Sequence, residues 1–116
     1  MAEGTLVLIT KPALGTVEGG DAEFGVQMLD KFLHALESEA DRPSAICFYT
    51  EGVRLVCKGS KVLLGLELLH GLSVRLLACQ SCLEHYGLVD AVAVGEVGNM
   101  KQIASLMMAA GRVITV

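Results

Sequence analysis

The sequence predicts an α/β protein, a three-layer α/β/α fold around a mostly parallel five-stranded sheet. Short, mostly apolar runs alternate along the chain with amphipathic segments, and these runs lack the regular polar–apolar alternation of a half-exposed strand. Strands of this kind are typical of parallel sheets that helices cover on both faces. With 116 residues, 53% of them hydrophobic, the chain is expected to form a single domain over residues 1–116 with a core of its own.

Five apolar runs predict the strands. The segment 53–57 fits either a short strand or a helical turn. In parallel sheets, ligands and reactive groups gather beyond the carboxyl ends of the strands, which directs attention to residues 49–52, 79–86 and 95–99. The predicted strands are residues 6–9, 45–49, 74–78, 91–94 and 113–116.

Helix-capping residues predict three helices between these strands. Asp21 follows a Gly-rich loop and is placed as the N-cap of the first helix, which carries an apolar stripe. Ser60 precedes a Leu-rich helix that is expected to end at Gly71. Asn99 and Gln102 have the spacing of a capping box and open the last helix.

Charge and hydrophobicity exclude several classes of protein. The net charge is −4, and the 9 basic residues do not cluster, so no nucleic-acid partner is expected. The most apolar segment, 62–79, contains Glu67, His70 and Arg75, which argues against a membrane helix and a membrane partner. No signal peptide is recognisable at the start, so a cytoplasmic location is expected. The surplus of apolar residues predicts a homo-oligomer.

Cys79 and Cys82 form the sharpest chemical signal. A thiol at the carboxyl end of a strand can be stabilised as the thiolate by unpaired backbone amides, and this spacing lets both sulfurs meet. Cys79 could attack a sulfane sulfur or a disulfide, while Cys82 resolves or shares the product. His85 could serve as a proton acceptor or a local cation. Glu51 and Glu96, near predicted strand ends, could orient a partner or a thiol, although solvated carboxylates are the more ordinary case.

Other interpretations of the cysteines stay open on sequence grounds. The pair could serve a disulfide oxidoreductase, or it could be two small apolar residues in a binding module without catalysis. A zinc site would use Cys79, Cys82 and His85 but lacks a fourth ligand, so no metal is expected. Cys47 lies within a strand and is assigned to the core.

Several separated motifs, in order, resemble the DsrE/DsrF-like sulfur-relay superfamily. Within it the chain is similar to the carboxy-terminal domain of YedF-type selenium-metabolism proteins, and the resemblance covers nearly the whole chain. The motifs are Phe48-Tyr-Thr-Glu-Gly52-Val53, Gly59-Ser60, Cys79-Gln-Ser-Cys82-Leu83, Tyr86-Gly-Leu88 and Val94-Gly-Glu-Val-Gly-Asn99-Met100.

The resemblance implies a protein that handles reactive sulfur or selenium. Cys79 matches the cysteine that receives sulfur as a persulfide in the relay proteins, and Cys82 matches the second cysteine of the YedF-type branch. Glu51, Gly52 and Asn99 lie in the matching motifs and are expected to support the site. The implied partners are sulfur-donor and sulfur-acceptor proteins, and the transfer needs no organic cofactor. The assembly is expected to be a dimer, trimer or hexamer.

Two departures from the YedF-type pattern stand out. Those proteins usually carry an amino-terminal TusA-like domain with a Cys-Pro-x-Pro motif, which this sequence lacks, so a TusA-like partner would come from another chain. Position 50 holds Thr where the branch leads us to expect Asn.

Overall fold

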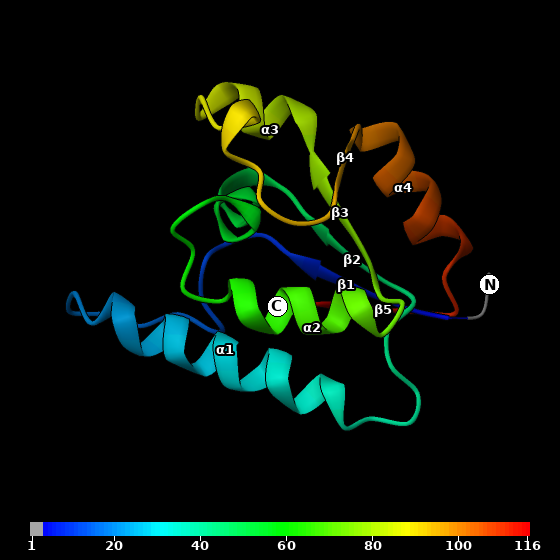
Figure 1. Cartoon of the computed structure of the whole chain (residues 1–116), viewed down its shortest axis with the longest axis horizontal. Coiled ribbons are helices and arrows are strands. Elements are labelled where there is room, and N and C mark those ends of the chain that lie inside the picture. The colour runs from blue at the N-terminus through cyan, green and yellow to red at the C-terminus, as the bar shows by residue number, and fades with distance from the viewer. Residues whose placement is uncertain (1–3) are drawn as a thin grey trace.

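Five parallel strands form the centre of the molecule (Figure 1). The computed structural model describes residues 4–116. Every neighbouring pair of strands is parallel, and the strand order is β4-β3-β2-β1-β5. The predicted five-stranded α/β fold is therefore confirmed. The strands are β1 (Thr5–Ile9), β2 (Ala45–Phe48), β3 (Arg75–Cys79), β4 (Glu96–Gly98) and β5 (Arg112–Thr115).

Helices connect these strands and cover both faces of the sheet. α1 lies beside Val7 of β1, because Phe32 shares a shallow cavity with that side chain. α4 lies beside Arg75. Arg75 pairs in register with Ala45, and Ala45 pairs with Leu6, so these three side chains share one face of the sheet. Val7 follows Leu6 in the strand and therefore points to the other face. α2 packs against α1 on the first face. The helical elements are α1 (Ala22–Glu37), η1 (Thr50–Val56), α2 (Leu63–Gly71), α3 (Gln80–His85), η2 (Val89–Ala91) and α4 (Met100–Ala109).

The core is built on the three inner strands, β1, β2 and β3. All residues of β1 and β2 are buried, and Phe48 is the largest side chain that is fully inaccessible. Continuous burial requires apolar residues on both faces of a strand, which explains why these runs lack the alternation of a half-exposed strand. The segment 62–79 contributes α2 and β3 to this core. Among residues 4–116, no helix is long and apolar enough to cross a membrane.

The helix ends follow the predicted caps in part. The Asn99 side chain accepts from the Gln102 amide at 2.9 Å, and the Gln102 side chain accepts from the Asn99 amide at 2.9 Å, which confirms the capping box. Asp21 is the N-cap of α1, but its side chain makes no capping hydrogen bond. Ser60 is not the N-cap of α2: the helix begins three residues later, and the Ser60 hydroxyl accepts from the Val62 amide.

The predicted strand at residues 91–94 is wrong. This apolar run instead ends η2 and forms an antiparallel bridge between Val92 and Cys57. Its backbone groups are satisfied there, since the Lys58 amide donates to the Ala91 carbonyl at 2.8 Å and the Ala93 amide to the Val56 carbonyl at 2.7 Å. The fourth strand comes later, over Glu96–Gly98, where the chain reaches β3.

This shift also corrects the expected position of Glu96. The residue begins β4 rather than following a strand, and it pairs in register with Leu77 in the middle of β3. Its carboxylate accepts two hydrogen bonds from the Arg75 guanidinium, at 2.9 and 3.0 Å. These hydrogen bonds hold the pKa of Glu96 below its usual value. Glu96 therefore ties β4 to β3 and does not contact a thiol.

Candidate functional site

Cys79 and Cys82 lie together at the carboxyl edge of the sheet. Cys79 is the last residue of β3 and the N-cap of α3, and Cys82 follows in the first turn of that helix. Figure 1 shows α3 beyond the arrowhead of β3. Cys79 is only 2% exposed, whereas Cys82 is half-buried. The pair therefore presents one sulfur toward the surface and keeps the other beneath it.

The two thiols influence each other. Burial is the main cause that raises the pKa of Cys82, and the neighbouring Cys79 side chain raises that pKa further. Both cysteines are free in this structure. Two free thiols placed at the N-cap and in the first turn of one helix can share a covalent partner, as a persulfide exchange or a transient disulfide requires.

A backbone amide from another segment contacts the Cys82 sulfur. The Thr50 amide, at the start of η1, donates to the Cys82 Sγ at a distance of 3.0 Å. This hydrogen bond favours the charged thiolate and opposes the effect of burial on the Cys82 pKa. The sequence led us to expect backbone donors near Cys79, whereas the structure provides one to Cys82.

Thr50 holds its amide in place through an unusual backbone conformation. Its φ of 47° lies in the left-handed region, which is disfavoured for a β-branched residue. The Thr50 hydroxyl lies within donating distance of two carbonyl oxygens, that of Tyr49 at 2.7 Å and that of Thr10 at 2.8 Å, and the second contact ties this conformation to the end of β1. Asn, the residue expected here from the YedF-type resemblance, adopts the left-handed region more readily than Thr. The hydroxyl bond thus compensates for a less suitable side chain.

Gly52 allows η1 to pack directly on the end of β1. A Cβ atom at this position would collide with the Ile9 carbonyl oxygen and crowd the Thr10 backbone. Gly52 is buried, and its amide donates to the Tyr49 carbonyl at 3.0 Å. Gly52 therefore sets the position of the backbone that carries the Thr50 amide.

The other supporting residues contribute less directly. Glu51 is exposed, and its carboxylate lies 3.7 Å from Arg54 Nε. The Asn99 side chain is engaged in the α4 cap. His85 is exposed at the end of α3, where its ring packs edge-on against Tyr86 with centroids 4.9 Å apart. The structure thus places these three residues around the carboxyl edge without giving them a contact to the sulfurs.

The remaining cysteines lie in the interior. Burial raises the pKa of Cys47 to about 11, which agrees with its assignment to the core. The Cys57 thiol donates to the Val53 carbonyl at 3.3 Å, and burial raises its pKa as well. Neutral, buried thiols react slowly, so these two cysteines provide internal controls for the pair at the carboxyl edge.

A metal centre finds no support in the geometry. Over the part of the chain that the structure describes, no three His, Cys, Asp or Glu side chains come together in a group that could hold a metal ion. The zinc alternative requires Cys79, Cys82 and His85 to converge, and they do not.

Replacing Thr50 by valine is expected to lower the free energy of unfolding by about 1 kcal/mol, since it keeps the shape of the side chain but removes the hydroxyl that holds the left-handed backbone. The Cys82 pKa should rise because the amide donor loses its anchor. Denaturant titration and the pH dependence of Cys82 alkylation measure the two effects. Thr16→Val, which alters an exposed hydroxyl bonded only to Lys11, is the control. An unchanged Cys82 pKa would show that the hydroxyl does not position the amide.

Comparison with known proteins gives structural matches only. No family model and no curated protein matches the sequence. The ychN protein from E. coli matches with a TM-score of 0.68 and 20% identity, over 98% of this chain and 99% of that one. MTH1491 from Methanobacterium thermoautotrophicum, titled a protein of unknown function, matches with a TM-score of 0.72 and 19% identity over the same shares.

A third structure has a similar relation to the chain. BT1422 from Bacteroides thetaiotaomicron, titled a conserved protein of unknown function, matches with a TM-score of 0.64 and 17% identity, over 97% of this chain and 95% of that one. The fold implied by the DsrE/DsrF-like resemblance is thereby confirmed. Over nearly its whole length, the chain shares the three-layer α/β fold of these proteins.

Proposed function

We propose that this protein is a sulfur or selenium carrier of the YedF-type branch, which accepts sulfane sulfur as a persulfide on Cys79 and passes it to a partner protein. The observation that carries the proposal is the arrangement of the two thiols at the carboxyl end of β3, with the Thr50 amide on the Cys82 sulfur. Parallel α/β sheets place their reactive groups at this edge. The fold agrees with a sulfur-relay protein, and the thiols supply the chemistry.

The first step is an attack of the Cys79 thiolate on the outer sulfur of a donor persulfide. A bond forms between Cys79 and that sulfur, the sulfur–sulfur bond of the donor breaks, and the donor leaves as a thiolate. The product is a persulfide on Cys79. Because Cys79 is 2% exposed, donors and acceptors must approach from the side of Cys82, which is the more accessible of the two.

The persulfide can then be discharged in two ways. An acceptor thiolate can attack the outer sulfur, so that Cys79 leaves as a thiolate and is ready for another cycle. Alternatively, the Cys82 thiolate attacks the inner sulfur, forms a disulfide with Cys79 and releases hydrosulfide. The Thr50 amide supports the second route because it stabilises the Cys82 thiolate before the attack. An external dithiol would then reduce the disulfide.

Self-association and a cytoplasmic location are part of the same proposal. Leu64, Leu68 and Leu72, spaced four residues apart on and just after α2, are 64%, 42% and 41% exposed. A row of leucines on one side of a helix is costly to leave in water and supports a homo-oligomer. A TusA-like protein is the proposed partner in sulfur transfer.

Intact-mass spectrometry tests the carrier function. After reduction and incubation with an inorganic polysulfide, the protein is expected to gain about 32 Da, the mass of one sulfur atom. The adduct should be absent in Cys79→Ser and present in Cys82→Ser. Cys57→Ser, a change at a buried thiol, is the matched control and should keep the adduct.

Three outcomes would contradict this assignment. An adduct that persists without Cys79 would move the carrier role to another thiol. Absence of any adduct, together with turnover in the reduction of insulin disulfides, would instead support a disulfide oxidoreductase. If the protein neither formed the adduct nor reduced insulin disulfides, the remaining interpretation would be a binding module without catalysis.

A further inference from the structure

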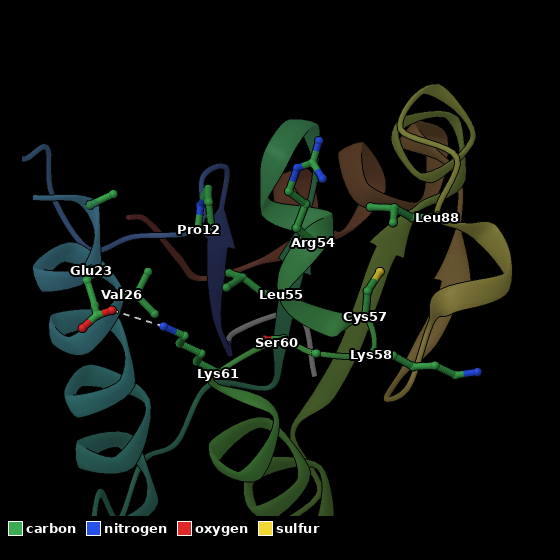
Figure 2. Close-up of a pocket in the computed structure, with 12 residues that line it drawn as sticks. Pro12, Glu23, Val26, Arg54, Leu55, Cys57, Lys58, Ser60, Lys61 and Leu88 are labelled. Carbon is green, nitrogen blue, oxygen red and sulfur yellow. Dashed lines mark hydrogen bonds and ion pairs between the residues drawn. The ribbon is translucent and has the colours of Figure 1, made fainter. Parts of the chain in front are cut away.

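We propose that a second site, separate from the thiol pair, binds a small organic anion with an apolar body. The site is a cavity of about 500 Å³ between α1, η1 and the loop before α2 (Figure 2). Cavities that hold small ligands usually have volumes of a few hundred Å³. Its lining residues are Pro12, Ala22, Glu23, Val26, Arg54, Leu55, Cys57, Lys58, Gly59, Ser60, Lys61 and Leu88.

The cavity lies where the topology of the sheet favours a ligand. Its walls come from the segments that follow three adjacent strands: Pro12 follows β1, Arg54 and Leu55 follow β2, and Leu88 follows β3 and α3. Segments beyond the carboxyl ends of parallel strands form the common ligand crevice of open α/β sheets. The position of this cavity therefore matches that of a binding site.

Apolar side chains form much of the lining. In Figure 2, Val26 and Leu88 extend from opposite sides toward the space above Leu55. Leu55 is itself 4% exposed and is part of the core, so this wall is fixed in position. The Cys57 thiol adds to the apolar surface, and its raised pKa keeps it neutral. A ligand with an apolar body would cover these groups from water.

Charged side chains give the cavity a positive character that the whole chain lacks. Three basic residues and one acidic residue line it, whereas the chain has 9 basic and 13 acidic residues. The Lys61 ammonium lies 3.3 Å from the Glu23 carboxylate across the cavity, and Figure 2 shows Lys58 directed outward. The Arg54 guanidinium carbon lies 4.5 Å above the Tyr86 ring, which fixes it at the rim. Arg54 Nε also lies 3.7 Å from the Glu51 carboxylate, so each cation already has one carboxylate neighbour. A guanidinium has five N–H donors and an ammonium has three, so Arg54 and Lys61 keep donors for an anion beyond these single contacts.

This site is distinct from the thiol pair. Neither Cys79 nor Cys82 lines the cavity. η1 separates the two: Thr50, at its amino end, contacts Cys82, whereas Arg54 and Leu55, farther along, line the cavity. Binding of an anion here requires no sulfur chemistry. A binding experiment therefore tests this site without testing the carrier function.

A titration with 8-anilinonaphthalene-1-sulfonate tests the site, because this probe joins an apolar ring system to one negative charge. The experiment uses the Cys79→Ser, Cys82→Ser double variant, so that thiol reactions cannot contribute. We expect saturable binding with one probe per chain and amide chemical-shift changes centred on Gly59, Ser60 and Lys61. The combined Arg54→Met, Lys61→Met changes should weaken binding roughly tenfold, since they remove both cations and keep the bulk of the side chains.

Three controls make the outcome decisive. Lys101→Met, which removes an exposed charge on α4, should leave the affinity unchanged. Leu68→Ser tests whether the probe binds to the exposed leucines of α2 instead. The uncharged analogue N-phenyl-1-naphthylamine should bind more weakly than the sulfonate. Shift changes centred on α2, equal loss of affinity with Lys101→Met, or equal binding of the uncharged analogue would each overturn the proposal.

Discussion

Replacing Gly52 by alanine should lower the free energy of unfolding by about 3 kcal/mol or more, which is a large effect for the addition of one methyl group. The added Cβ atom would collide with the carbonyl oxygen of Ile9, and a backbone atom at the end of an inner strand cannot move aside. η1 would have to shift away from β1. Equilibrium unfolding in urea, followed by circular dichroism, measures the loss.

Gly71→Ala is the matched control for this change. Gly71 ends α2, and a Cβ atom there would meet nothing within 4 Å. Its substitution should be neutral or stabilise the protein by less than about 1 kcal/mol. If Gly52→Ala were as stable as this control, the close packing of η1 on β1 would not hold in solution, and the position of the Thr50 amide would lose its structural basis.

Replacing Cys79 by alanine should shift the alkylation of Cys82 to lower pH. The pKa of Cys82 is raised by burial and by Cys79, and lowered by the Thr50 amide. A raised pKa means that less thiolate is present at neutral pH, so alkylation of Cys82 is slow there and accelerates as the pH increases. Removing Cys79 eliminates one of the causes that raise the pKa, and the rate profile should move in the acidic direction.

Iodoacetamide kinetics with mass detection measure this profile from pH 7 upward. Cys47→Ala is the control, since that thiol lies within β2 and does not contribute to the Cys82 pKa. Its Cys82 profile should coincide with that of the unaltered protein. A Cys82 profile that is insensitive to Cys79 would show that the two sulfurs do not interact, and the disulfide route of discharge would then fail.

The sequence predicted the fold well because most of its strands are apolar runs without regular polar–apolar alternation. Such runs predicted β1, β2, β3 and β5 to within a residue or two at each end. The fourth strand was missed because hydrophobicity cannot distinguish a strand from an apolar loop that pairs with another segment. The run at 91–94 is more apolar than Glu96–Gly98, but only the latter reaches β3.

The sequence could indicate those parts of the candidate site that consist of side chains, but not those that consist of backbone groups. The spacing of Cys79 and Cys82, together with their place after an apolar run, is enough to indicate the thiol pair. Thr50 stands out in the sequence only as a departure from the YedF-type pattern, because its contribution comes from the backbone. The second cavity was also missed, since Pro12, Val26, Arg54 and Leu88 are far apart in the sequence and no motif joins them.

The amide that contacts Cys82 has a consequence for how this site can vary among related chains. A main-chain donor belongs to the shape of the loop and not to any particular side chain, so residues that accept the left-handed conformation can replace one another at position 50 without removing it. Sequence comparison would then find this position variable, and an alanine scan would assign it a role in stability. The function of such a position becomes visible only when the backbone itself is altered, for example by an ester in place of the Thr50 amide.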